Sequence, residues 1–142
     1  MHGDMCFSNI LIDLDSMVLK LVDPKGSFWE SPSIYGDIRY DLAKIRQCLV
    51  GSYDFITQGL FSFEVLNEAS FNLRVGNNSD LALESFFNNK VLEFGLDIEE
   101  IKFLEAYLFL TMIPLHNDNP TRQRAFFLKS MELFSKLQWN NY

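Results

Sequence analysis

Three side chains near the start of the chain have the types and spacing needed to handle phosphates. Asp4 and Asn9 lie in one short polar stretch with four residues between them, and Asp23 follows fourteen residues after Asn9. A carboxylate in such a loop can orient a hydroxyl group and accept its proton. Amide and carboxylate oxygens suit Mg²⁺, which commonly completes its shell with phosphate oxygens. The residue types and spacing therefore suit transfer of a phosphoryl group to a hydroxyl, with a divalent metal bound at the phosphates.

The stretch between Asn9 and Asp23 must position these side chains. Residues 10–12 are apolar, residues 13–16 are typical of a turn, and residues 17–22 alternate between apolar and polar types. Pro24 and Gly26 then stop a strand ladder. We expect an antiparallel hairpin that brings Asn9 and Asp23 opposite each other at its open end.

The loop has a recognisable pattern. His2-Gly3-Asp4 followed by Asn9 has the D-x-x-x-x-N spacing of the protein-kinase catalytic loop. Together with Leu21-Val22-Asp23-Pro24 and Tyr35-Gly36-Asp37-Ile38-Arg39-Tyr40-Asp41-Leu42-Ala43, it resembles the aminoglycoside phosphotransferase and choline kinase-like family. Cys6-Phe7-Ser8 and the Asp-Pro-Lys-Gly stretch that begins at Asp23 are similar to members associated with bacterial capsule or surface-polysaccharide genes.

The resemblance implies a role for each residue of the loop. Asp4 would be the catalytic base, and His2 would support the loop by hydrogen bonds. Asn9 and Asp23 would bind Mg²⁺ at the phosphates of ATP. The γ-phosphate would pass to a hydroxyl of a small molecule, either a sugar or an amino-alcohol.

Further residues would act around this group. The resemblance implies that Asp41 braces the loop from the start of a helix, and that Lys25 either reaches a phosphate of the cofactor or lies in solvent. Asp37 is expected to cap the same helix. Like Asp41, it would support the site residues without contacting the substrate. Arg39 and Lys44 are expected to be solvated charges.

Two other functions compete with a kinase. The apolar run that ends in Asp13-Leu14-Asp15 resembles the opening of haloacid dehalogenase-type phosphatases, in which Asp13 would be the nucleophile and Asp15 the acid. That fold needs further parallel strands and a later Lys, and we expect both carboxylates to form a hairpin turn instead. The second alternative is a pseudokinase or interaction module without catalysis.

Composition limits the partners. The net charge of −7 argues against nucleic acid and anionic membranes, because both require basic patches. No apolar run reaches the length of a membrane span, and two cysteines are too few for a disulfide scaffold. We expect one cytoplasmic domain over residues 1–142.

The remainder of the chain predicts helices. Apolar periodicity favours helices over residues 37–51, 53–64, 81–94, 97–115 and 119–137, with a break at 77–79 and an extended segment over 69–75. The fold class is therefore mainly α with a small antiparallel hairpin. The resemblance implies the C-terminal lobe of a protein kinase-like phosphotransferase, with the loop and hairpin in residues 1–36 and a helical part in residues 37–142.

The lobe that would clamp the nucleotide is not recognisable in this sequence. Only Met1 precedes the loop, and no G-x-G-x-x-G or P-loop pattern occurs. We expect a fragment of a longer protein, a half that pairs with another chain, or a remnant kept for binding, and in each case weak activity or none for this chain alone. Apolar surface at the cleft would then favour self-association through that face.

Overall fold

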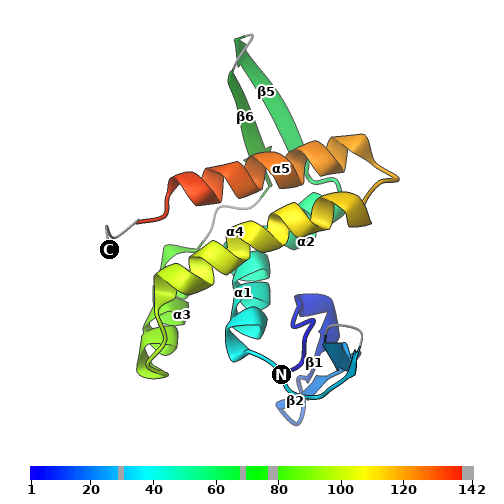
Figure 1. The fold of residues 1–142 in the computed structure, drawn as a ribbon, viewed down its shortest axis with the longest axis vertical. Coiled ribbons are helices and arrows are strands. Elements are labelled where there is room, and N and C mark those ends of the chain that lie inside the picture. Colours follow the sequence, from blue (N-terminus) through cyan, green and yellow to red (C-terminus); the bar gives the residue numbers. More distant parts are fainter. Residues whose placement is uncertain (29–30, 68–69, 77–79, 139–142) are drawn as a thin grey trace.

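The computed structural model of the protein describes residues 1–28, 31–67, 70–76 and 80–138 (Figure 1). After a short 3-10 turn, η1 (Phe7–Asn9), the elements are β1 (Ile10–Asp13), β2 (Val18–Leu21), β3 (Ser27–Phe28), β4 (Ser31–Pro32), α1 (Ile38–Leu49), α2 (Tyr53–Thr57), β5 (Phe61–Asn67), β6 (Ser70–Val75), α3 (Leu81–Glu93), α4 (Ile98–Leu115) and α5 (Pro120–Ser135). The prediction of a mainly helical chain with small antiparallel strands is confirmed.

The predicted first hairpin is present. Strands β1 and β2 pair antiparallel from Ile10 opposite Leu21 to Asp13 opposite Val18. The backbone N–H of Val22 donates to the carbonyl of Asn9 at 3.0 Å, which extends the pairing by one residue beyond the strands. This register sets Asn9 beside the end of the second strand, as the hairpin prediction required.

A side chain caps the start of four of the predicted helices, and Asp37 is the cap expected for the first of them. The cap side chains accept hydrogen bonds from backbone N–H groups in the first helical turn, and they are Asp37 for α1, Asp80 for α3, Asp97 for α4 and Asn119 for α5. Gly95 ends α3 with φ of +72°, a conformation that glycine adopts without strain. The break predicted at residues 77–79 lies outside the described residues.

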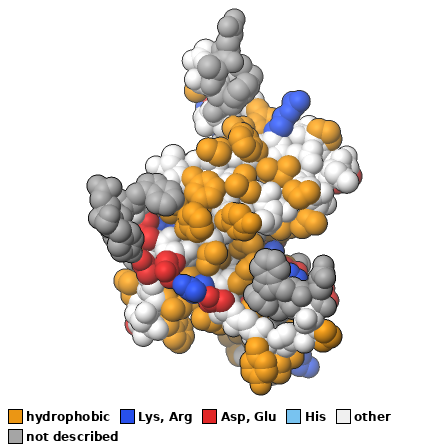
Figure 2. All heavy atoms as spheres, viewed as in Figure 1, with side chains coloured by type: hydrophobic (Ala, Val, Ile, Leu, Met, Phe, Trp, Pro, Cys, Tyr) orange, Lys and Arg blue, Asp and Glu red, His pale blue; other side chains and the backbone are white. Residues whose placement is uncertain are grey.

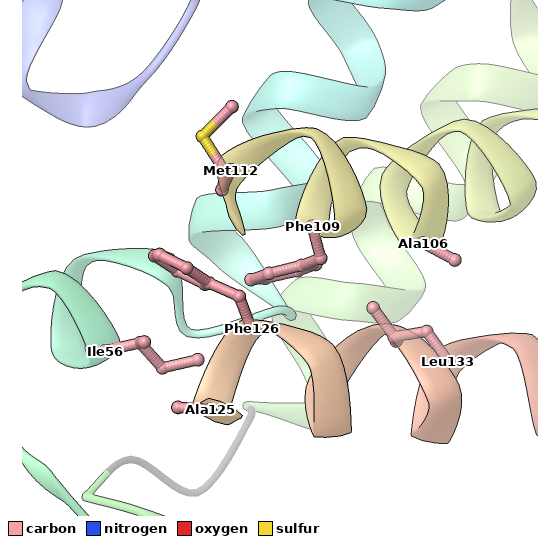
Figure 3. Packing of buried hydrophobic residues seen from close by; sticks show 7 residues of the cluster. All are labelled: Ile56, Ala106, Phe109, Met112, Ala125, Phe126 and Leu133. Atoms are coloured by element: carbon pink, nitrogen blue, oxygen red, sulfur yellow. The ribbon is translucent and has the colours of Figure 1, made fainter. Parts of the chain in front are cut away.

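The core lies on both sides of α4, which packs against α1 and α5 (Figure 1). One cluster joins α2, α4 and α5 and contains Ile56, Ala106, Phe109, Met112, Ala125, Phe126 and Leu133 (Figure 3). A second cluster joins α1, α3 and α4 and contains Ala43, Phe87, Val91, Ile101 and Leu108. Helix α1, which carries Asp41 and Lys44, is therefore fixed to the centre of the molecule.

The prediction of a helix over residues 53–64 is wrong beyond its first turns. Helix α2 ends at Thr57, and β5 pairs with β6 in a second hairpin that projects from α5 (Figure 1). Phe61 and Phe63 alternate with polar residues and share a face with Leu73 and Val75, which pack against the core. Strand periodicity and this burial outweigh helix propensity. The extended segment predicted at 69–75 is confirmed from Ser70 onward, and Ala69 lies outside the described residues.

The segment predicted as a loop over 27–36 contains the two-residue ladder of β3 and β4. Of the helices in the described ranges, none combines the length and the apolar character needed to cross a bilayer.

Candidate active site

Gly3 allows the loop to pack closely against the segment that follows the hairpin. Its φ is +82°, and a Cβ at this position would lie 2.8 Å from the Cβ of Lys25. The N–H of Lys25 donates to the carbonyl of His2 at 2.9 Å. A residue with a side chain at position 3 would therefore suffer both backbone strain and a steric clash.

Asp41 fixes the start of the loop from the first turns of α1. It is only 2% exposed, and its two carboxylate oxygens accept hydrogen bonds from the N–H groups of His2 at 2.6 Å and Gly3 at 2.7 Å. Charge-assisted bonds of this kind offset the cost of burying a carboxylate. Asp41 thus occupies the bracing position that the resemblance implies.

His2 connects the loop to the hairpin. Its Nε2 lies 2.9 Å from the carbonyl of Val22, and its Nδ1 lies 3.3 Å from the N–H of Asp4. A carbonyl can only accept and an N–H can only donate, so the neutral ring carries its proton on Nε2. Both nitrogens are engaged, which makes His2 a support for the loop and leaves no ring nitrogen for a substrate.

The carboxylate of Asp4 is held at both oxygens. Oδ1 lies 3.0 Å from the ammonium of Lys44, and Oδ2 accepts from the Nδ2 of Asn9 at 3.2 Å. The same Nδ2 donates to the carbonyl of Asp4 at 2.9 Å. The side chain of Asp4 is still 41% exposed, so the carboxylate is fixed in direction while one side remains open to solvent.

Lys44 is the residue of this site that the sequence analysis missed. It is 5% exposed, not solvated as expected, and its ammonium also lies 5.7 Å from the ring centre of Tyr53. Burial opposes its charge, but the hydrogen bond and charge of Asp4 outweigh burial and raise the pKa of Lys44. The sequence did indicate that Lys44 could lie at the site, because position 44 is three residues after Asp41 and is therefore on the same face of the helix.

Asn9 and Asp23 have the chemistry of a Mg²⁺ pair. Both acceptors of the Asn9 Nδ2 group are oxygens, which fixes the amide orientation and leaves Oδ1 without a hydrogen bond in the described ranges. Asp23 is exposed, and its carboxylate has no partner among the residues that the structure describes. Two protein oxygens fit a metal that keeps water and phosphate as its other ligands.

The backbone at Asp23 and the side chains near it bear on metal binding. Asp23 has φ of +56°, a sparsely populated conformation for any residue with a side chain, and such strain often accompanies functional positions. Within the described part of the chain, no three or more His, Cys, Asp or Glu side chains gather to hold a metal. Among the described residues, a metal here would therefore have at most two ligands of these four types.

The remaining predicted residues lie at the edge of the site. The ammonium of Lys25 lies 5.9 Å from the ring centre of Tyr40. Asp37 caps α1, accepting from the N–H of Arg39 at 2.9 Å, and it also pairs with the Arg39 guanidinium. Among the described residues, the hydrogen bonds of the Asp37 side chain go to Arg39 alone, so its part is to start the helix that carries Asp41 and Lys44.

Asp13 has the turn role that local bonding predicts. Its Oδ1 accepts from the N–H of Asp15 at 3.1 Å, and its Oδ2 accepts from the hydroxyl of Ser16 at 2.6 Å. These bonds lower the pKa of Asp13, the Ser16 hydroxyl having the largest effect. The described strands all pair antiparallel, whereas the phosphatase alternative needs a parallel sheet.

Comparison with known proteins gives no family for this chain. No family model, curated protein or solved structure matches it.

Proposed function

We propose that this chain is the catalytic lobe of a small-molecule kinase with a protein kinase-like fold. The observation that carries the proposal is the geometry of Asp4. Its carboxylate is held by Lys44 and Asn9 and remains open to solvent on one side. Hydrogen bonds join its loop to Val22 and Lys25, the residues on either side of the segment that contains Asp23. Phosphoryl transfer depends mainly on positioning and on stabilising charge, which such an arrangement can supply.

The proposed step transfers the γ-phosphoryl group of ATP to a hydroxyl. The hydroxyl oxygen forms a bond to the γ-phosphorus, and the bond from that phosphorus to the β–γ bridging oxygen breaks. ADP leaves with the electron pair of that bond. Asp4 orients the hydroxyl and accepts its proton, which then passes to solvent.

Mg²⁺ would be held by Asn9 and Asp23, and when bound it would offset the charge of the phosphates. His2 and Asp41 keep the loop backbone in place without contacting the reacting groups. The acceptor class, a sugar or an amino-alcohol, follows from the resemblance alone.

Isothermal titration with ATP in excess Mg²⁺ tests this proposal. We expect D23A to bind at least tenfold more weakly than the wild-type chain, because Mg²⁺ would lose a protein carboxylate. D15A is the matched control, since Asp15 lies at the far end of the same hairpin, and it should bind as the wild type does. Equal binding by D23A and the wild type would overturn the metal role.

A second candidate, a binding module, is favoured by the surface of the first hairpin. Leu11, Ile12, Leu19 and Leu21 are each more than half exposed, and Figure 2 shows hydrophobic side chains at this end and across α4 and α5. A two-stranded hairpin with apolar side chains on both faces is marginally stable by itself.

The chain should therefore self-associate through the surface of the first hairpin. Sedimentation velocity should show L19K shifted toward monomer, and a wild-type monomer at high concentration would contradict this.

A further inference from the structure

Lys44 has an unusual place beside the proposed base. Its ammonium is 3.0 Å from Asp4 Oδ1, yet its own side chain is buried beneath the loop. We propose that Lys44 is a positioning residue for phosphoryl transfer, which holds the Asp4 carboxylate in the direction needed to orient the hydroxyl. This inference rests on the function proposed above.

Without Lys44, the Asp4 carboxylate would be held less firmly. Among the described residues, only the Asn9 bond to Oδ2, at 3.2 Å, would remain on a carboxylate that is partly in solvent. Rotation of that carboxylate would then be limited from one side only. Since small errors in the position of a reacting group reduce rates strongly, a second fixed contact has a direct consequence for catalysis.

Charge gives Lys44 a second effect at the same place. Solvent reaches the carboxylates of both Asp4 and Asp23, and both would repel an incoming triphosphate. The ammonium of Lys44 offsets the charge of Asp4 from behind, where water is largely excluded and screening is weak. Because Lys44 is buried, it acts through Asp4 and does not contact substrate.

A purely structural ion pair is the competing explanation. Removing one partner of a buried pair destabilises a protein mainly when the group left behind stays buried without its counter-charge. In K44M the group left behind is Asp4, which solvent reaches. The substitution therefore separates the two explanations: a positioning role predicts lost rate with intact folding, whereas a structural role predicts loss of both together or of neither.

The test compares wild type, K44M, K44R and the control K102M, whose lysine pairs with Glu99 on α4. Each protein is assayed for MgATP affinity, for hydrolysis of ATP with water as the acceptor, and for Tm. We expect K44M to keep its Tm and to bind MgATP more weakly, because the charge of Asp4 is no longer offset, while hydrolysis at saturating MgATP falls at least tenfold. K44R should recover part of the rate, and K102M should match the wild type.

The outcomes distinguish the two proposals. A wild-type chain that does not bind MgATP overturns the proposed function and this inference with it. If the wild type binds MgATP but does not hydrolyse it, the inference alone is overturned. The same holds if the wild type binds MgATP and K44M hydrolyses ATP at the wild-type rate. A rate in K44M that falls only in parallel with Tm also overturns it, because the lysine would then be structural.

Discussion

Helix α1 carries two buried cations two residues apart, and they face different surroundings. Lys44 pairs with Asp4, and Arg46, which is 3% exposed, pairs through Nε with Oε2 of Glu105 at 2.8 Å. The cations are similarly buried, but the carboxylates are not, since Glu105 is 0% exposed. A pair that shows its carboxylate to solvent can serve a substrate, whereas a pair enclosed on both sides can only hold the fold together.

Arg46 connects three helices. Besides Glu105 on α4, its guanidinium lies 2.7 Å from Oε1 of Glu84 and 3.4 Å from Oδ1 of Asn88, both on α3. Gly51 closes the other side, because a Cβ there would lie 2.8 Å from Oε1 of Glu105. These contacts fix α1, and with it the face that carries Lys44.

R46M should produce the largest change in stability when measured at about pH 8. In R46M, Glu105 would remain buried without its nearest cation and must either keep an unpaired charge or take up a proton at that pH. Removing one partner of a buried pair typically costs about 3–5 kcal/mol of unfolding free energy. For a chain of 142 residues this corresponds to a fall in Tm of roughly 10 °C or more, measurable by circular dichroism. R39M, which removes two exposed ion pairs, should change the free energy far less than R46M does. Equal effects of the two substitutions would contradict the comparison.

E105Q should change the pH dependence of stability by a smaller amount. Burial raises the pKa of Glu105 from its ordinary 4.5 to about 7, with Arg46 opposing this only in part. Between these values the folded chain binds a proton that the unfolded chain releases. The contribution is therefore complete below pH 4.5 and is lost as the pH rises through 7, at most about 3 kcal/mol in total.

Urea unfolding of wild type and E105Q at about pH 5 and about pH 8 measures this difference. The wild type should lose more stability than E105Q toward the higher pH. If both proteins lose the same amount, other groups titrate and the role given to Glu105 is wrong.

K44M should have the smallest effect on stability. Its removal leaves Asp4 bonded to Asn9 and open to water, and a Met side chain fills most of the space of the lysine stem. We expect a change in unfolding free energy within about 1 kcal/mol. A loss as large as that of R46M would mean that the two pairs are equivalent.

Much of the fold could be predicted because local signals decide it. Asp37, Asp97 and Asn119 begin helices where the sequence shows caps before apolar periodicity. Strand β5 was missed because Phe61 and Phe63 occur in a run that also suits a helix, and only packing of that face on the core selects the strand. Contacts between distant segments decided that element.

The residues of the candidate site also include some that the sequence predicted and some that it did not. Asp4, Asn9, Asp23, His2 and Asp41 were identified by spacing and resemblance. Lys44 was not, because its role depends on which face of α1 meets the loop, and a lysine three residues after an aspartate is usually a surface residue. Arg46 and Glu105, 59 positions apart in the sequence, could be paired only once α1 was seen to cross α4.

Paramagnetic broadening by Mn²⁺ with ADP tests the central claim most directly, because it reports where a metal nucleotide lies on the chain. In amide NMR spectra of the wild type, the signals of Asn9, Val22 and Asp23 should broaden beyond detection, while those of Glu105 and Leu133 should remain. D23N should remove most of this broadening. Broadening centred elsewhere, or identical in D23N, would contradict a metal-nucleotide site at the loop and hairpin.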